Sequence, residues 1–418
     1  MIRVNDSESC TVILFTHLPE DVAVTDRVTR PAIVSPILDS MMCGGLSILI
    51  CCGILAHGFV WPDSYDGLNR STVSSWKVGV LLVVLINFPH FMASYRLLYS
   101  SRANVKKSPW AAIYVPGLLI VLAGVAISLL VVGDRLSGDV SSFMELLWTN
   151  GLTDALWNHT CWAIGFGIDT ALTAVSIFYL AWHYNGQAWG MTASFAYIGG
   201  IRFDATERRM IRAAYRAMLG THVLWLLPGF LSDVELNTGM DVTDIRVSLE
   251  AISYIYFATA TVVTIPMGLL GFQRATRRTG KQIPLRSVLP WISIYFWYLL
   301  LYVHVYFFIV VQLAHAFQYL SFPLRVDLNR YDRAAPHSAA IRVCRVTMVY
   351  LLLLVVGLIL LWLPGELEYS GYLSTRVFSV AFTISTIVNI HHYFVDGAIW
   401  KISNPDVRRD LFSHIGST

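Results

Sequence analysis

The sequence contains few charged residues. Only 14% of its 418 residues are Asp, Glu, Lys or Arg, whereas a soluble protein usually has about 25%. Such a chain has too few polar side chains to cover a compact water-soluble core, and its net charge of +3 is too small for a phosphate-binding surface. We therefore exclude a disordered protein, a nucleic-acid binder and an ordinary soluble enzyme, and expect a polytopic helical membrane protein.

Several common functional motifs are also absent. The six cysteines form no Cys-x-x-Cys pair, so nothing indicates a disulfide framework, and covalent haem attachment through Cys-x-x-Cys-His is excluded. The sequence has no phosphate-binding P-loop and no dinucleotide fingerprint. It also lacks the Gly-x-Ser-x-Gly elbow of many hydrolases. Candidate chemistry must therefore come from polar side chains within the apolar segments.

Apolar residues make up 56% of the chain and gather in nine segments, most of them near or above the roughly 20 residues that a membrane-spanning helix needs. These segments lie at 34–60, 74–98, 109–133, 158–184, 213–231, 248–272, 288–320, 343–364 and 375–400. We expect an all-α bundle of about nine spans, within a range of eight to ten. It would form one transmembrane domain at 34–400, between a cytoplasmic segment at 1–33 and a cytoplasmic tail at 401–418.

The charges of the loops predict the orientation. Basic residues cluster at 96–107, 202–216, 325–333 and 401–409, while the opposite loops are acidic. Because positive loops stay in the cytoplasm, we expect both termini inside a plasma or bacterial inner membrane. Segment 288–320 has basic residues beyond both ends, so either it turns back or the short fifth segment does not cross fully. The sequence leaves both alternatives open.

Histidines within the apolar segments are the most informative residues, because ionisable groups in a membrane are costly and usually face a protein interior. Candidate ligands lie near the basic ends of four segments: His90, His183, His315 and the pair His391-His392. Histidines at one depth on four helices can converge in a bundle core. Consecutive helical residues point about 100° apart, so we expect His392, rather than His391, to face the same centre as Asp396.

Polar neighbours within about a turn could orient these rings or take part in the chemistry. His392 and Asp396 are spaced i,i+4 and share a helix face. We predict Asp396 and Tyr393 as catalytic residues, and Gln187, Gln318 and Asn389 as residues that support the cofactor. Two other interpretations remain open. The polar groups could only join helices by hydrogen bonds, or they could form a proton or substrate pathway.

The arrangement of His90, His183, His315 and the stretch His391-His392-Tyr393-Phe394-Val395-Asp396 resembles the histidine-rich membrane oxygenases. These include the membrane desaturase and hydroxylase class and the Brp/Blh-type carotene dioxygenases. The resemblance implies non-haem iron bound near one membrane face and acting on a lipid-soluble substrate. The HxxxH and HxxHH boxes of the desaturases do not occur in this sequence.

The leading hypothesis is therefore a membrane metalloenzyme, an iron-dependent oxygenase, desaturase or hydroxylase of a lipid or isoprenoid. Zinc or haem b are alternative cofactors, and an electron donor is a further candidate partner. A b-type haem electron-transfer protein and a proton-coupled transporter are the competing functions. We expect the aromatic segment 288–320 to wall the substrate cavity. The Gly186-x-x-x-Gly190 motif is typical of a loop or of close helix contact.

Overall fold

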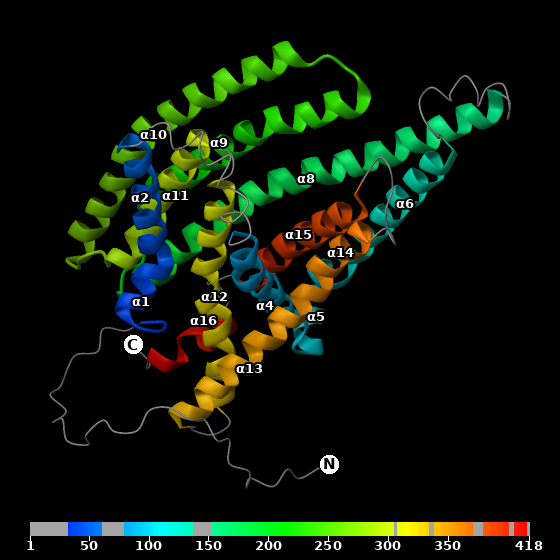
Figure 1. Cartoon of the computed structure of the whole chain (residues 1–418). Helices are drawn as coiled ribbons and strands as arrows, with labels where there is room; N and C mark the ends of the chain where they lie inside the picture. Colours follow the sequence, from blue (N-terminus) through cyan, green and yellow to red (C-terminus); the bar gives the residue numbers. More distant parts are fainter. Residues whose placement is uncertain are drawn as a thin grey trace, which may run out of the picture. The chain divides into compact units, whose positions relative to one another are not determined.

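The computed structural model describes residues 32–60, 79–136, 152–304, 307–333, 338–370, 379–400 and 405–415. Within these ranges the chain is helical and contains no strand (Figure 1), which confirms the all-α prediction. The predicted N-terminal segment 1–33 lies almost entirely outside the described residues.

Among the described residues, eight helices are long and apolar enough to cross a membrane. They cover Pro36–His57, Gly79–Tyr99, Trp110–Val131, His159–Ile198, Ala205–Leu236, Thr243–Thr279, Leu285–Val303 and Ala339–Tyr369. Eight of the nine expected segments thus have a counterpart. The ninth forms helix α15 (Val380–Ile399), whose two histidines and one aspartate reduce its hydropathy.

The segment expected at 288–320 is broken into two helices. Helix α11 (Leu285–Val303) ends at His304, which adopts an extended backbone, and α12 (Phe308–Asp332) follows. The side-chain amide of Gln318 on α12 donates to Ser293 Oγ on α11 over 3.4 Å. Since these two residues lie at similar separations from the break, the two helices run back past each other. The structure thus favours the turn-back alternative for this segment.

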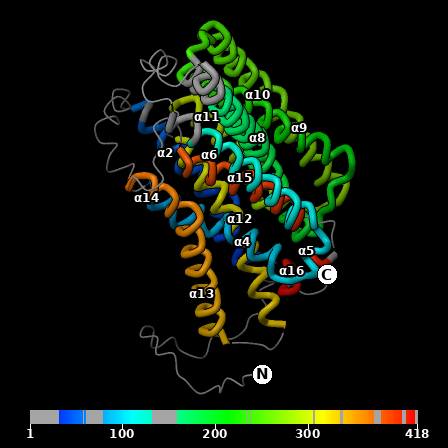
Figure 2. The backbone as a smooth tube through the Cα atoms, turned by 90° about the vertical axis from the view of Figure 1, so that its right-hand side faces the viewer, coloured from blue at the N-terminus to red at the C-terminus, as the bar shows by residue number. Residues whose placement is uncertain are grey.

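Four helices form the part of the bundle that carries the candidate site. They are α4 (Phe88–Tyr99), α8 (Leu152–Ile198), α12 and α15. Helix α15 packs against α4, α8 and α6 (Val115–Leu136), while α12 packs against α4 and α8. Figure 2 shows α15 running alongside α6. The chain segments of the site therefore come from distant parts of the sequence.

The remaining helices lie outside this group of four. They are α1 (Pro36–Ser40), α2 (Leu46–Val60), α5 (Arg102–Lys107), α9 (Ala205–Thr238), α10 (Thr243–Thr279), α13 (Ala339–Gly357), α14 (Leu363–Tyr369) and α16 (Pro405–Phe412), with a 3₁₀ turn at Ser413–Ile415. Wider π-helical turns interrupt the spans at Met41–Gly45, Val83–Asn87, Trp110–Tyr114 and Leu358–Trp362.

Ion pairs join the C-terminal ends of α4 and α12 and hold α16 against α12. Arg96 at the end of α4 pairs with Asp327 near the end of α12. Arg330 and Arg333, also from the end of α12, lie 2.8 and 2.9 Å from the Asp410 carboxylate on α16. The expected tail 401–418 therefore includes a helix that packs on α12. Since these ends meet, α4 and α12 run in the same sense from the site toward the charged end.

Candidate metal centre

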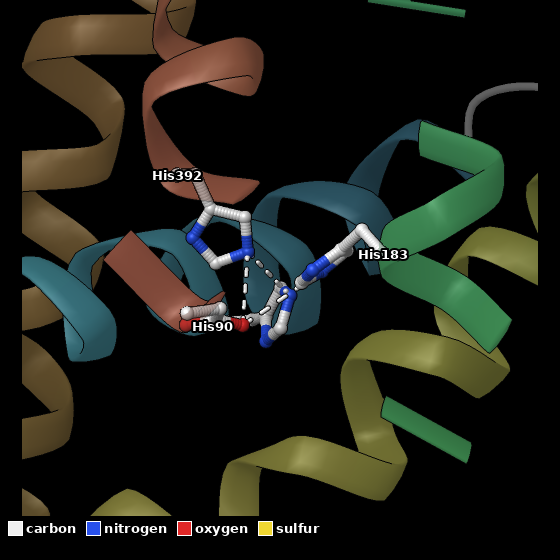
Figure 3. Close-up of side chains that lie close together, drawn as sticks. His90, His183 and His392 are labelled. Carbon is white, nitrogen blue, oxygen red and sulfur yellow. Dashed lines mark hydrogen bonds and ion pairs between the residues drawn. The ribbon is translucent and has the colours of Figure 1, made fainter. Parts of the chain in front are cut away.

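Four imidazoles converge inside the bundle, one from each of the four site helices. They belong to His90 on α4, His183 on α8, His315 on α12 and His392 on α15. Each of these residues is at most 6% exposed. The Nε2 atoms of His90 and His392 lie 3.2 Å apart, and those of His183 and His315 lie 3.0 Å apart. Figure 3 shows His90, His183 and His392 pointing toward one another.

The carboxylate of Asp396 joins this cluster. Asp396 follows His392 by one turn of α15, and its Oδ2 lies 3.6 Å from His392 Nε2 and 3.8 Å from His183 Nε2. One ligand atom from each of His90, His183, His392 and Asp396 lies within 4.8 Å of the other three. This buried group, hereafter the His3Asp group, could hold a metal ion.

The spacing of the nitrogens suits ligands of one ion. With metal–nitrogen bonds of about 2.1 Å, two adjacent imidazole ligands place their nitrogens roughly 3.0–3.4 Å apart. The pairs His90–His392 and His183–His315 fall within or at the edge of that range. His315 stands beside the His3Asp group, since its ring centroid is 5.1 Å from that of His90. It is thus available as a fourth imidazole.

Local irregularity in the second span places His90. The π-helical turn at Val83–Asn87 runs directly into Phe88-Pro89-His90. Because Pro89 has no N–H, the carbonyl of Leu85 lacks its usual helical donor, and the Tyr350 hydroxyl of α13 donates to this carbonyl instead. Helix α13 also approaches closely at Gly357, where an added Cβ would lie 2.6 Å from Phe88 Cβ. These contacts fix the start of α4, and with it His90.

Aromatic rings hold the imidazole planes. Tyr184 stacks on His315 with ring centroids 4.0 Å apart, and Tyr393 stacks on His183 at 4.7 Å. Phe91 packs against His392 at 4.3 Å. Rings packed in this way have few rotamers open to them, so the Nε2 atoms are directed to a common region before any ion binds.

Three residues orient the Asp396 carboxylate. Its Oδ1 accepts hydrogen bonds from Ser94 Oγ at 2.5 Å and from Tyr319 Oη at 3.0 Å. The indole N–H of Trp400 donates to Tyr319 Oη at 2.6 Å. These bonds engage Oδ1 and leave Oδ2 directed at the imidazoles, which is how outer residues commonly orient a ligating carboxylate.

Sequence reasoning did not assign these three orienting residues, although two of them carry a usable signal. Ser94 follows His90 by four residues and Tyr319 follows His315 by four, which repeats the spacing of His392 and Asp396. A polar residue one turn beyond each histidine, on helices that run in the same sense, forms a second layer next to the first. Trp400 gave no such signal.

His391 does not belong to the cluster, contrary to its prediction as a metal ligand. Its Nε2 donates to the Ala111 carbonyl at 2.8 Å, and its ring stacks on Tyr95 with centroids 4.9 Å apart. The physical reason is the 100° turn between consecutive helical residues. His392 faces Asp396, and its neighbour therefore points toward the π-helical turn at Trp110–Tyr114.

The residues expected to support the cofactor bind backbone groups instead of ring nitrogens. The Gln187 amide donates to the His315 carbonyl at 2.8 Å, and Gln318 donates to the Cys43 carbonyl at 2.7 Å. Within the described ranges, no hydrogen bond or ring contact joins Asn389 to the cluster, and the Nδ1 atoms of His90, His315 and His392 have no hydrogen-bond partner. The two glutamines thus position helices and do not fix tautomers.

A cavity of about 550 Å³ reaches the His3Asp group, within the usual range for small-molecule sites. His183 and Asp396 line its buried end, and Trp110 and Trp182, which are 72% and 60% exposed, line its outer part. Most wall residues belong to α8, to α15 and to the turn before α6. Of the residues that the structure describes in segment 288–320, only Tyr319 lines this cavity, so those residues do not form its wall as expected.

No family model matches the chain, and no similar protein is found among curated proteins or solved structures. The resemblance to histidine-rich membrane oxygenases therefore stays an expectation, and the function must be argued from the site.

Proposed function

We propose that the chain is an integral membrane metalloenzyme that holds one non-haem iron ion and oxidises a lipid or isoprenoid substrate, as an oxygenase, desaturase or hydroxylase. One observation carries the proposal. The His3Asp group, with His315 beside it, lies at the buried end of a cavity that eight aromatic residues help to line. A closed structural metal site would have no such access for a small molecule.

The donor set favours a redox-active transition metal. Imidazole suits iron, zinc and copper, and a site of histidines and one carboxylate with an open position is typical of non-haem iron oxygenases. The cavity reaches His183 and Asp396, so the open position would face the substrate. Bound iron would supply the activation of O₂ that oxidation of an unreactive hydrocarbon requires.

The protein side chains supply binding, orientation and exclusion of water. Asp396 would offset part of the ion's charge, and its hydrogen bonds to Ser94 and Tyr319 keep Oδ2 on the ligand side. Tyr393 both stacks on His183 and lines the cavity. A substrate there would contact the Tyr393 ring while its reacting carbon approaches the metal side of His183.

The proposed orientation places the charged end of the site helices in the cytoplasm. Arg96, Arg330 and Arg333 gather at this end, and positively charged segments are retained on the cytoplasmic side. An electron donor would then approach from the cytoplasm, over the ends of α12 and α16.

The same geometry disfavours a b-type haem with two of these histidines as axial ligands. Axial nitrogens stand on opposite faces of the macrocycle, about 4 Å apart if each bond is about 2 Å. The paired Nε2 atoms lie only 3.0 and 3.2 Å apart, and the rings contact each other directly. A porphyrin between them would require the helices to separate.

Metal analysis with a spectroscopic probe tests the proposal. The protein, purified without oxygen and supplied with Fe²⁺, should bind about one iron per chain and give the EPR signal of a ferrous–nitric oxide complex, which reports an open coordination position. Retention of zinc with no nitric oxide signal would contradict the iron proposal. A Soret band would indicate haem, and proton-coupled flux in liposomes from metal-free protein would favour the transporter.

A further inference from the structure

Three glycines line the cavity, two on α8 and one on the facing α15. They are Gly186, Gly190 and Gly397. A Cβ atom added at any of them would have no other heavy atom within 4 Å. The sequence suggested a loop or a close helix contact for the Gly186-x-x-x-Gly190 motif. The motif instead lies inside α8, and no neighbouring helix packs closely against it. These glycines border open space inside the cavity.

Another glycine on the same helix shows what close helix contact looks like. A Cβ added at Gly165 would lie 2.9 Å from the Leu130 side chain and 3.0 Å from the Ala126 carbonyl of α6. Gly165 thus allows α6 and α8 to approach each other, whereas no neighbouring helix packs against Gly186 or Gly190. The absence of side chains at the latter positions adds width to the cavity and gains no packing.

The glycines lie on the helix face that leads away from the metal centre. The part of α8 that lines the cavity includes His183, Gly186, Gly190 and Ser194, a spacing that keeps residues on one side of a helix. On α15 Gly397 directly follows Asp396. The result is a slot with glycine on two opposing helices and a ligand of the His3Asp group at its inner end.

Residues of two candidate membrane spans border the opening of the slot. Trp182 lies inside the candidate span His159–Ile198, and Trp110 begins the span Trp110–Val131. Both tryptophans are largely exposed, and Gly186 and Gly397 are exposed as well. An exposed tryptophan at the start of a span, such as Trp110, is typical of the membrane interface. In a bilayer this opening would face lipid, with Lys107 and Ser108 as polar residues on its border.

We infer that the slot accepts a single extended hydrocarbon chain of a membrane lipid directly from the bilayer. The chain would pass between Gly190 and Gly397 to His183 and Asp396, and its polar end would stay beside Lys107 and Ser108. Because helices α8 and α15 wall the slot on two sides, it would accept a linear chain in preference to a fused-ring lipid such as a sterol. This inference rests on the proposed function, because it identifies the substrate class of the same site.

Photo-crosslinking tests it in the full-length protein in phosphatidylcholine nanodiscs. The probe is a linear C16 fatty acid with a diazirine near its methyl end, and the crosslinked peptides are mapped by mass spectrometry. We expect crosslinks within 183–194 and 393–398. Gly190→Leu and Gly397→Leu should reduce their yield about tenfold, since a side chain would fill the slot. Gly190→Ala should reduce it less.

Gly167→Leu is the matched control, because Gly167 is on the same helix, is equally open and does not line the cavity. Unchanged crosslinking in both leucine variants of the slot, equal loss in Gly167→Leu, or equal labelling by a diazirine sterol would overturn the inference. Metal content of the same samples separates the two claims. Wild-type protein with metal but no crosslink in the slot defeats only this inference. Crosslinking there without metal supports the lipid site and defeats the proposed metalloenzyme.

Discussion

His90 Nε2 lies 3.2 Å from His392 Nε2, although 302 positions separate the two residues in the chain. The contact joins α4 to α15 at the point where the side chains of His183 and Asp396 also converge. Two buried neutral imidazoles can share one N–H···N hydrogen bond, or both nitrogens can bind one cation. The nearby Asp396 Oδ2, 3.6 Å from His392 Nε2, favours the cation because a buried carboxylate needs a positive partner.

Replacement of either histidine should therefore remove the metal. We expect His90→Ala and His392→Ala to retain less than about a tenth of the wild-type metal, since even loss of an outer residue costs 10–100-fold in affinity. His391→Ala is the matched control, because His391 neighbours His392 but bonds to the Ala111 carbonyl. Elemental analysis of the purified variants measures this. Equal metal loss in His391→Ala and His392→Ala would contradict the assignment.

The two hydroxyl groups that donate hydrogen bonds to the Asp396 carboxylate give a second prediction. Ser94→Ala and Tyr319→Phe each remove a hydrogen bond to Oδ1, so the carboxylate can rotate away from the imidazoles. We expect each variant to lower metal affinity about 10–100-fold, as measured by competition with a metal chelator. Tyr295→Phe is the control, since its buried hydroxyl bonds to Thr264 elsewhere in the bundle. Wild-type affinity in both site variants would show that Oδ1 needs no support.

Close packing beside Phe88 gives a third prediction. Gly357→Ala places a methyl group 2.6 Å from Phe88 Cβ, so α13 and α4 must separate. We expect a loss of about 1–3 kcal/mol in stability and weaker metal binding, because His90 lies two residues beyond Phe88. Thermal unfolding and the chelator competition measure the two effects. Gly365→Ala, where an added Cβ meets nothing within 4 Å, should change neither.

Helical periodicity and charge patterns predicted the features that depend on one helix at a time. The spacing of His392 and Asp396 placed both on one face, and the apolar segments gave the spans. The charges beyond both ends of segment 288–320 fitted two alternatives. No proline or glycine lies next to His304 to indicate the break there. The extended backbone of His304 is apparent only from the structure, in which α11 and α12 pack against each other.

Features that depend on several helices at once were beyond the sequence. The hydrogen bond from Trp400 to Tyr319 joins residues 81 positions apart, and no periodicity predicts such a pair. The Gly186-x-x-x-Gly190 motif has the same pattern whether a helix packs against it or a cavity lies beside it. Only the position of α15 distinguishes these cases, since Gly397 faces the same open space.

The ion pairs of α16 predict that the docking of this helix on α12 depends on pH. Leu411 on this helix lines the cavity, and Asp410 beside it binds Arg330 and Arg333. Burial raises the pKa of Asp410, but the hydrogen bonds and charges of the two arginines outweigh it and hold the pKa below its usual range. A depressed carboxylate pKa stabilises the docked helix above the unfolded-state value of about 3.9, and this stabilisation is lost as pH falls through the lower folded-state value.

Hydrogen–deuterium exchange of residues 405–415, corrected for the intrinsic effect of pH on exchange, should therefore show a protected α16 at pH 6–7 and loss of protection only below about pH 4. Asp410→Asn should expose the helix at neutral pH, because the two arginines lose their shared carboxylate, and should remove the acid transition. Asp406→Asn is the control, since Asp406 is exposed and binds Lys107 on α5. It should leave the transition of α16 in place. If Asp410→Asn kept both the protection and the acid transition, another group would have to hold α16 against α12.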